Sequence, residues 1–288
     1  MTNIEEEINS TQYIEDVIRP KNVKELVIGQ QDKLINSIKI GFKTLFYSKK
    51  WLIYIALAFI FLPVIILIEI VIEGGTIEIK KPDEAFVDVV FDLLFPLIFV
   101  FGCLLISLPL SADEISDHSI ELYLVRPIKR EVYWLSRWIV VNVAVYCVNI
   151  IIYFVYFLFV HAFAEKGVFA GMGGNFYVFG GVAIILLLAT LIYSGSFLLV
   201  GMIGNRGLLL SFMLAIFELF FISMLFLSDS PYIPQNNLYE IANDLLPDHF
   251  DFDTPKDLKL QNAWIYVTIF PIVVFVGGAF YLRMREIK

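Results

Sequence analysis

A densely charged segment between two apolar runs is residues 111–138, SADEISDHSIELYLVRPIKREVYWLSRW, which holds nine charged residues and a histidine. Ser111 and Glu114 have the spacing of a capping box, in which each side chain accepts a hydrogen bond from the backbone of the other residue. Acidic residues follow in the first turns and basic residues at the far end, as the helix dipole favours. Pro127 then stops the helix. The pattern predicts a short amphipathic helix over about 111–125, which is either a rigid handle for a partner or a solvated connector.

A second set of polar residues lies inside long apolar runs. Asn142, Tyr146, Asn149 and Tyr153 step by four, three and four residues, so they share one helix face. Such a stripe in a lipid-crossing helix faces protein or water, and it either joins helices or lines a transport path. Glu218, within MLAIFELFFISM, is an ionisable group at the centre of another apolar run. A group in that position is usually functional or paired.

The other reactive residue types form no catalytic or metal-binding pattern. Cys103 and Cys147 lie in apolar runs and have neither disulfide nor metal spacing. An intramembrane serine protease would pair Ser194 or Ser196 with His161. The serines are expected nearer the inner end of their span and the histidine at the outer end of its own, and no Gly-x-Ser-Gly context surrounds either serine. We therefore expect no catalytic residue and no bound metal in this chain.

Composition indicates what must position these residues. The chain has 288 residues, of which 59% are apolar and 17% charged, with a mean hydropathy of +0.78. Soluble domains carry about 25% charged residues. Apolar runs long enough to cross about 30 Å of hydrocarbon as helix recur along the chain. We expect an all-α polytopic membrane protein with six transmembrane helices, at residues 51–72, about 86–110, 134–163, 176–201, 207–227 and 263–282.

Basic residues predict the orientation of these spans. With the N-terminus inside, the cytoplasmic segments hold 16 of the 21 Lys and Arg residues, and the outer loops hold the other five. Both termini are therefore predicted inside, in a multi-pass protein of the cell membrane. Residues 111–125 then face the cytoplasm. We expect the lipid bilayer, and no nucleic acid, as a partner.

Three regions surround the predicted spans. Residues 1–32 form a polar cytoplasmic segment, and residues 33–50 a helix that lies along the membrane interface ahead of the 51–288 transmembrane domain. The apolar face of that helix is expected to comprise Leu34, Ile38, Phe42, Leu45 and Phe46.

The longest outer loop is about 228–262. A short amphipathic helix through Leu238, Ile241 and Leu245 is predicted in it. The acidic DHFDFD run that follows lacks the glycine and the distal glutamate of an EF-hand loop, so a solvated acidic loop is favoured over a cation site.

The charged segment resembles the coupling-helix region of ABC-2-type ABC transporter permeases. The family pattern runs as Glu, three residues, Gly-Thr, an aliphatic, Glu, aliphatics, then a polar residue, Pro, an aliphatic, a polar residue and Arg. His118 and Ser119 stand where Gly-Thr is usual, and Lys129 where Ser is common. The matching positions are Glu114, Ile120, Glu121, Leu122, Leu124, Pro127 and Arg130.

The resemblance implies the transmembrane permease subunit of an ABC transporter that works as an exporter. The 111–125 coupling helix would dock in a groove of a separate cytoplasmic ATPase subunit, and two copies of the chain would pair with two ATPases. No Gly-Lys dipeptide occurs, so the chain has no P-loop, and ATP and Mg²⁺ would bind in the partner. The residues expected to serve ATPase coupling are Glu114, Ile115, Asp117, His118, Glu121, Leu122, Arg126, Pro127 and Arg130.

Two other functions remain as alternatives. An ABC-linked membrane subunit can transmit force to an extracytoplasmic partner without moving a solute, with the acidic outer loops as its contact. An ion-coupled secondary transporter built around Glu218 would need no ATPase, although neither inverted repeats nor paired broken helices are evident.

Overall fold

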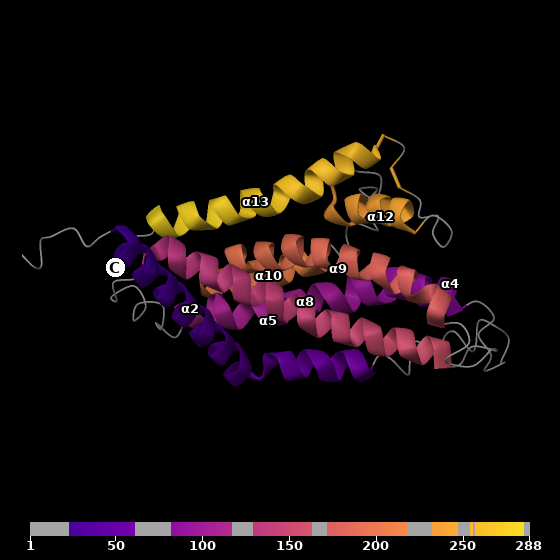
Figure 1. Cartoon of the computed structure of the whole chain (residues 1–288), viewed down its shortest axis with the longest axis horizontal. Coiled ribbons are helices and arrows are strands. Elements are labelled where there is room, and N and C mark those ends of the chain that lie inside the picture. Colours follow the sequence, from indigo (N-terminus) through magenta and orange to yellow (C-terminus); the bar gives the residue numbers. More distant parts are fainter. Residues whose placement is uncertain are drawn as a thin grey trace, which may run out of the picture.

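The computed structural model describes residues 23–60, 82–116, 129–162, 172–217, 232–246, 254–255 and 257–284, and in these ranges it is helical with no strand. Long helices lie roughly along one axis of an elongated bundle (Figure 1). The helices are α2 (Val23–Ser48), an unlabelled helix Lys50–Ile60, α4 (Pro82–Val89), η1 (Val90–Phe99), α5 (Val100–Ser107), η2 (Leu108–Leu110), α6 (Ala112–Ser116), α8 (Arg130–Ala162), α9 (Met172–Gly201), α10 (Asn205–Ile216), α12 (Pro234–Leu245) and α13 (Leu260–Met284).

Within the part of the chain that the structure describes, three helices, α8, α9 and α13, are long and apolar enough to cross a membrane. A fourth crossing is possible if the bent pair of helices 85–96 and 100–115 counts as one span. The short apolar helices 50–60 and 206–216 coincide with the starts of the predicted first and fifth spans. The rest of those two spans, 61–72 and 218–227, lies outside the described residues.

The bundle has two distinct ends. At the first, called the α2 end, Arg130 Nη1 at the start of α8 donates to the carbonyl of Leu282 in the last turn of α13 (3.1 Å). At the second, called the α12 end, His161 Nε2 lies 3.1 Å from Asp83 Oδ1, which joins the end of α8 to the start of α4. Figure 1 shows α2 and α12 at these opposite ends.

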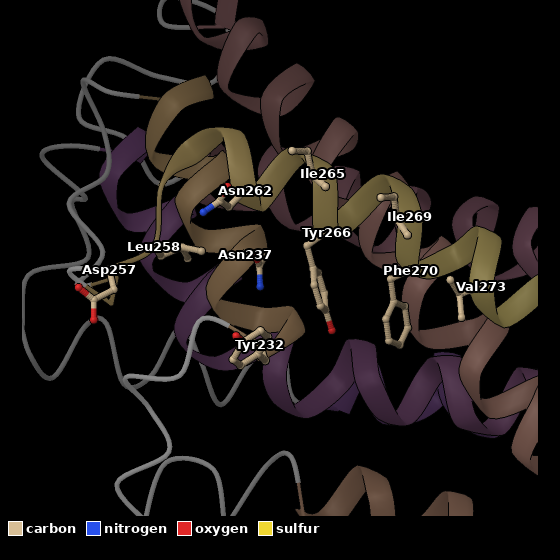
Figure 2. A pocket seen from close by; sticks show the side chains of 10 residues that line it. All are labelled: Tyr232, Asn237, Asp257, Leu258, Asn262, Ile265, Tyr266, Ile269, Phe270 and Val273. Carbon is tan, nitrogen blue, oxygen red and sulfur yellow. The ribbon is translucent and has the colours of Figure 1, made fainter.

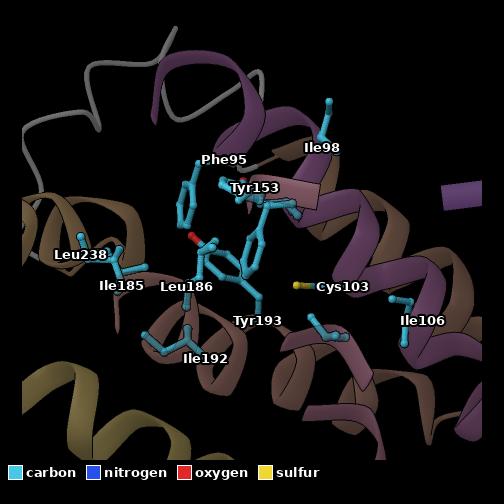
Figure 3. Packing of buried hydrophobic residues seen from close by; sticks show 14 of the residues in the cluster. Phe95, Ile98, Cys103, Ile106, Tyr153, Ile185, Leu186, Ile192, Tyr193 and Leu238 are labelled. Atoms are coloured by element: carbon cyan, nitrogen blue, oxygen red, sulfur yellow. The ribbon is translucent and has the colours of Figure 1, made fainter. Parts of the chain in front are cut away.

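An aromatic core joins the η1–α5 segment to α8 and α9. Phe95 and Phe99 stack with their ring centroids 5.0 Å apart, and Tyr193 meets Phe99 edge-on at 6.0 Å. Tyr153 from α8 points into the same group (Figure 3), and all four side chains are buried. Such ring pairs contribute about 0.5–1.5 kcal/mol each beyond their buried area. The core therefore holds the bent η1–α5 segment against the two longest helices.

The π-helical turn η1 contains Pro96, which explains its form. Proline has no backbone N–H and crowds the preceding turn, so a helix that keeps it must open locally. In an i to i+5 pattern the Phe91 carbonyl would pair with residue 96, and that residue has no proton to donate. Tyr239 Oη on α12 donates to the Phe91 carbonyl instead (2.9 Å). The helix predicted at about 86–110 is thus present but not uniformly α-helical.

Two local predictions have clear outcomes. The second span was predicted to end at about residue 110, and the α-helix does change there to the 3₁₀ turn η2, which contains Pro109. The amphipathic helix expected near residues 236–247 is α12, with Leu238 and Ile241 buried.

Helix α2 corresponds to the interfacial helix predicted at residues 33–50, but it differs from that prediction in its length and in which side chains are buried. It begins at Val23, ten residues before the expected start at Lys33. Phe46 was assigned to the apolar face but is 60% exposed, and the most buried side of α2 in the described part is Ser37, Gly41 and Leu45. The buried face differs from the predicted one because α2 packs on α8. The small residues Ser37 and Gly41 let the two helix backbones approach closely, as small residues do between membrane helices.

Candidate functional site

Glu114, in the first turns of α6, is buried rather than exposed. Its side chain is 3% exposed, and the Arg137 side chain beside it is fully buried. Arg137 Nε donates to Glu114 Oε2 at 3.0 Å, and Arg137 Nη2 lies 2.7 Å from Glu114 Oε1, so the guanidinium holds the carboxylate through one charge-assisted hydrogen bond and a second close ionic contact. Tyr133 Oη donates to the same Oε2. The carboxylate is therefore shared by two side chains of α8.

Helix α2 completes this group, which we call the Glu114 cluster: Ser37, Glu114, Tyr133, Ser136 and Arg137. Arg137 Nη1 donates to the backbone carbonyl of Ser37 (3.2 Å), and the Ser37 and Ser136 hydroxyl oxygens lie 2.7 Å apart. Both serines are buried. Three segments far apart in sequence, namely α2, α6 and the start of α8, thus meet at one buried charge pair.

The sequence explains why these side chains converge. Tyr133, Ser136 and Arg137 are spaced three and four residues apart, so they share one face of α8. The guanidinium carbon of Arg137 also lies 4.9 Å from the centre of the Tyr133 ring, a cation–π contact. On α2, a Cβ added to Gly41 would lie 2.7 Å from Arg137 Nη1. Glycine at position 41 therefore makes room for the arginine.

The capping box predicted for Ser111 and Glu114 is wrong. Ser111 Oγ donates to the Ser107 carbonyl (2.9 Å), and the Glu114 carboxylate turns to Arg137 and Tyr133. The physical reason is that the guanidinium brings a full opposite charge to the buried carboxylate, whereas the backbone N–H of Ser111 would offer only a dipole. Ser111 is also enclosed, because a Cβ at Gly201 would overlap its Oγ.

A second ion pair, close by, is of the ordinary surface kind. Lys50 Nζ and Asp113 Oδ2 are 2.5 Å apart, with side chains 31% and 30% exposed. Such pairs contribute about 0–1 kcal/mol. Removing one residue of a buried ion pair lowers the free energy of unfolding by about 3–5 kcal/mol. Replacing both residues by well-packed apolar ones often leaves stability unchanged. Stability alone therefore does not account for the Glu114–Arg137 pair.

The other predicted coupling residues divide into two groups. Ile115 is half-buried and faces Gly204, before the start of α10, and Arg130 binds the end of α13. Their role in coupling stays a prediction. The remaining ones lie outside the described residues: Asp117, His118, Glu121, Leu122, Arg126 and Pro127. Glu218, the predicted intramembrane acid, also lies outside them.

The polar stripe on α8 joins helices at two points. Ser194 Oγ on α9 donates to Asn142 Oδ1 (2.9 Å), and Tyr54 Oη, from the helix 50–60, donates to Asn149 Oδ1. Asn142 and Asn149 each donate their own amide protons to α8 carbonyls four residues back. These bonds support the interpretation of the two asparagines as interhelical contacts.

The two tyrosines of the stripe differ from the asparagines. Tyr146 is half-buried, and Tyr153 is fully buried with no hydrogen-bond partner for its hydroxyl among the residues described. A role for either tyrosine in a transport path stays a prediction.

Ser194 and His161 do not form a serine–histidine pair. Ser194 lies opposite Asn142, and His161 is 19 residues further along α8, a rise of about 28 Å. Within the described ranges no group of three His, Cys, Asp or Glu residues is placed to hold a metal ion.

Sequence reasoning missed Arg137, Tyr133 and Ser37. Arg137 had been counted only among the basic residues that set orientation. One signal in the sequence could have indicated the site. Arg137 follows Tyr133 by one helical turn and adjoins Ser136, at the start of a predicted transmembrane helix.

No protein-family model, curated protein or solved structure matches this chain.

The Tyr54–Asn149 bond can be measured by a double-mutant cycle with Tyr54→Phe and Asn149→Ala. We expect a coupling energy of about 0.6–1.7 kcal/mol, the range found for hydrogen bonds between membrane helices. The measurement is unfolding in mixed micelles with increasing denaturing detergent. Asn142→Ala in place of Asn149→Ala is the control, because Asn142 bonds to Ser194. Equal coupling in both cycles would contradict the contact.

The buried charge pair predicts a non-additive stability pattern. Glu114→Gln and Arg137→Met should each lower the free energy of unfolding by about 3–5 kcal/mol, since each leaves an uncompensated group. The double variant should recover most of that loss, because neither charge remains. Asp113→Asn is the matched control and should cost about 0–1 kcal/mol. A double variant whose loss equals the sum of the single losses would show that the two residues do not interact.

Proposed function

We propose that the chain is the transmembrane permease subunit of an ABC exporter, driven by a separate cytoplasmic ATPase through the 111–125 coupling helix. The observation that carries this proposal is the Glu114 cluster. It anchors the first turn of the predicted coupling helix inside the protein, to α8 and to α2 at once. A connector that only spans two helices gains nothing from burying a charge pair, which is costly to desolvate.

The anchoring also indicates how motion would travel. A partner that binds the part of the segment beyond α6 would pull on α6, and α6 is tied to α8 by Glu114 and to the helix 50–60 by Asp113. Helix α8 packs along α9 and α13, and Arg130 holds the end of α13. Displacement of one short helix would therefore be passed to the apolar helices of the bundle as rigid-body movement.

We propose six spans with both termini in the cytoplasm, and a dimer of two such chains. The direction of the described helices supports the count. The helix 50–60, α8 and α10 start at the α2 end, whereas α4–α5, α9 and α13 end there. The α2 end then faces the cytoplasm, with its lysines on α2, and α12 lies on the outer side.

The coupling role is tested by charge reversal in the predicted docking helix. The tagged chain is purified from its native membranes, and a co-purifying polypeptide with a P-loop sequence is identified by mass spectrometry. Glu121→Lys should lower the amount of that polypeptide by at least about tenfold, a loss of 1.4 kcal/mol. Glu131→Lys is the control, an exposed charge reversal outside residues 111–125. If both variants retain the ATPase equally, or if wild type carries none, the proposal is wrong.

The orientation is tested by cysteine labelling in a Cys147→Ser background. Tyr232→Cys, where the native side chain is 80% exposed, should react with a membrane-impermeant maleimide in intact cells. Glu131→Cys, exposed at the α2 end, should react only after permeabilisation. Asn237 is unsuitable as an outer position because it is 1% exposed. Labelling of Glu131→Cys in intact cells would place the α2 end outside and would contradict the proposed orientation.

A further inference from the structure

A cleft of about 570 Å³ lies between α12 and α13, at the end of the bundle away from the Glu114 cluster. Tyr266 and Phe270 project into it from α13, and Asn237 faces it from α12, with Tyr232 beside the start of that helix (Figure 2). Nothing in the proposed coupling mechanism uses this site.

One end of the cleft is polar. Asp257 and Asn262 are exposed there, and the amide of Asn237 and the hydroxyl of Tyr232 lie near them. Asp257 is the one charged side chain among the described residues that line the cleft. This end offers an anion together with neutral amide and hydroxyl groups, which suits a ligand that carries both a cation and a hydrogen-bond acceptor.

The other end is apolar and open to the surroundings of the bundle. Ile265, Ile269 and Val273 follow one another at four-residue spacing on α13, and they are 49%, 51% and 60% exposed. Figure 2 shows Val273 at the far end of the cleft from Asp257. From Asn262 to Val273 the helix rises by about 16 Å, close to half of the roughly 30 Å hydrocarbon thickness of a bilayer. The apolar wall thus has the depth of one leaflet.

We propose that this cleft binds one zwitterionic phospholipid whose headgroup carries a primary ammonium. The ammonium lies against Asp257, and the phosphate oxygens accept hydrogen bonds from the Asn262 amide and the Tyr232 hydroxyl. One acyl chain runs along Ile265, Ile269 and Val273. A headgroup with a net negative charge is disfavoured because its charge would meet the Asp257 carboxylate.

The headgroup is tested by native mass spectrometry of the full chain in micelles with equal amounts of phosphatidylethanolamine and phosphatidylglycerol that have the same acyl chains. Wild type should retain the ethanolamine lipid preferentially. Asp257→Asn should reduce that preference by about threefold, as expected for a partly exposed ion pair. Asp244→Asn, an exposed acid on α12 outside the cleft, should leave it unchanged. Equal retention of both lipids, or no effect of Asp257→Asn, would overturn the proposal.

The position of the acyl chain is tested by filling the apolar end. Val273→Trp should lower the occupancy of bound lipid by at least about threefold, since the larger ring takes the place of the chain. Val276→Trp is the matched control, because Val276 is similarly exposed on α13 (58%) and does not line the cleft. Thermal unfolding of both variants checks that each is folded. If the two variants retain the same amount of lipid, the lipid is bound elsewhere and the proposal fails. These outcomes are independent of whether an ATPase co-purifies.

Discussion

A full positive charge and a full negative charge are enclosed together where α2, α6 and α8 meet. Arg137 is fully buried and Glu114 is 3% exposed, so each depends on the other for its solvation. That requirement orders the surroundings: Gly41 must be small, Tyr133 must stand one turn ahead of Arg137, and the Ser37 carbonyl must face the guanidinium. Residues 111–116, which follow η2, therefore cannot behave as an independent loop. Their first turn is part of the same packed unit as the long helices.

Helices held in this way respond to force differently from helices held by apolar packing alone. Apolar contacts are non-directional, so they allow side chains to slip past one another. Hydrogen bonds, charge-assisted ones included, have preferred geometries, so they favour movement of the linked segments as one body. Asn142 with Ser194 and Tyr54 with Asn149 extend this kind of contact along α8. The proposed mechanism depends on that stiffness.

The positions of the long helices could be predicted because length and hydropathy are local properties of the sequence. The predicted span 134–163 corresponds to α8 and 263–282 to α13, with boundaries within four residues. The site was harder to predict, because Ser37 and Arg137 are 100 residues apart and nothing local pairs them. Arg137 at the end of an apolar run looked like an orientation signal. The Ser111–Glu114 spacing matched a local motif, but a stronger long-range partner took the carboxylate.

The sequence order of the Glu114 cluster has a consequence for biosynthesis. Glu114 leaves the ribosome 23 residues before Arg137, a delay of about 1–5 s. Throughout that interval the carboxylate lacks the guanidinium that it contacts in the finished protein, so α6 must stay in contact with water or headgroups. Helix α2, made earlier still, cannot close on its final neighbours until α8 has begun to insert. A chain in which α8 has not inserted therefore leaves the Glu114 carboxylate without the arginine that neutralises it in the finished protein.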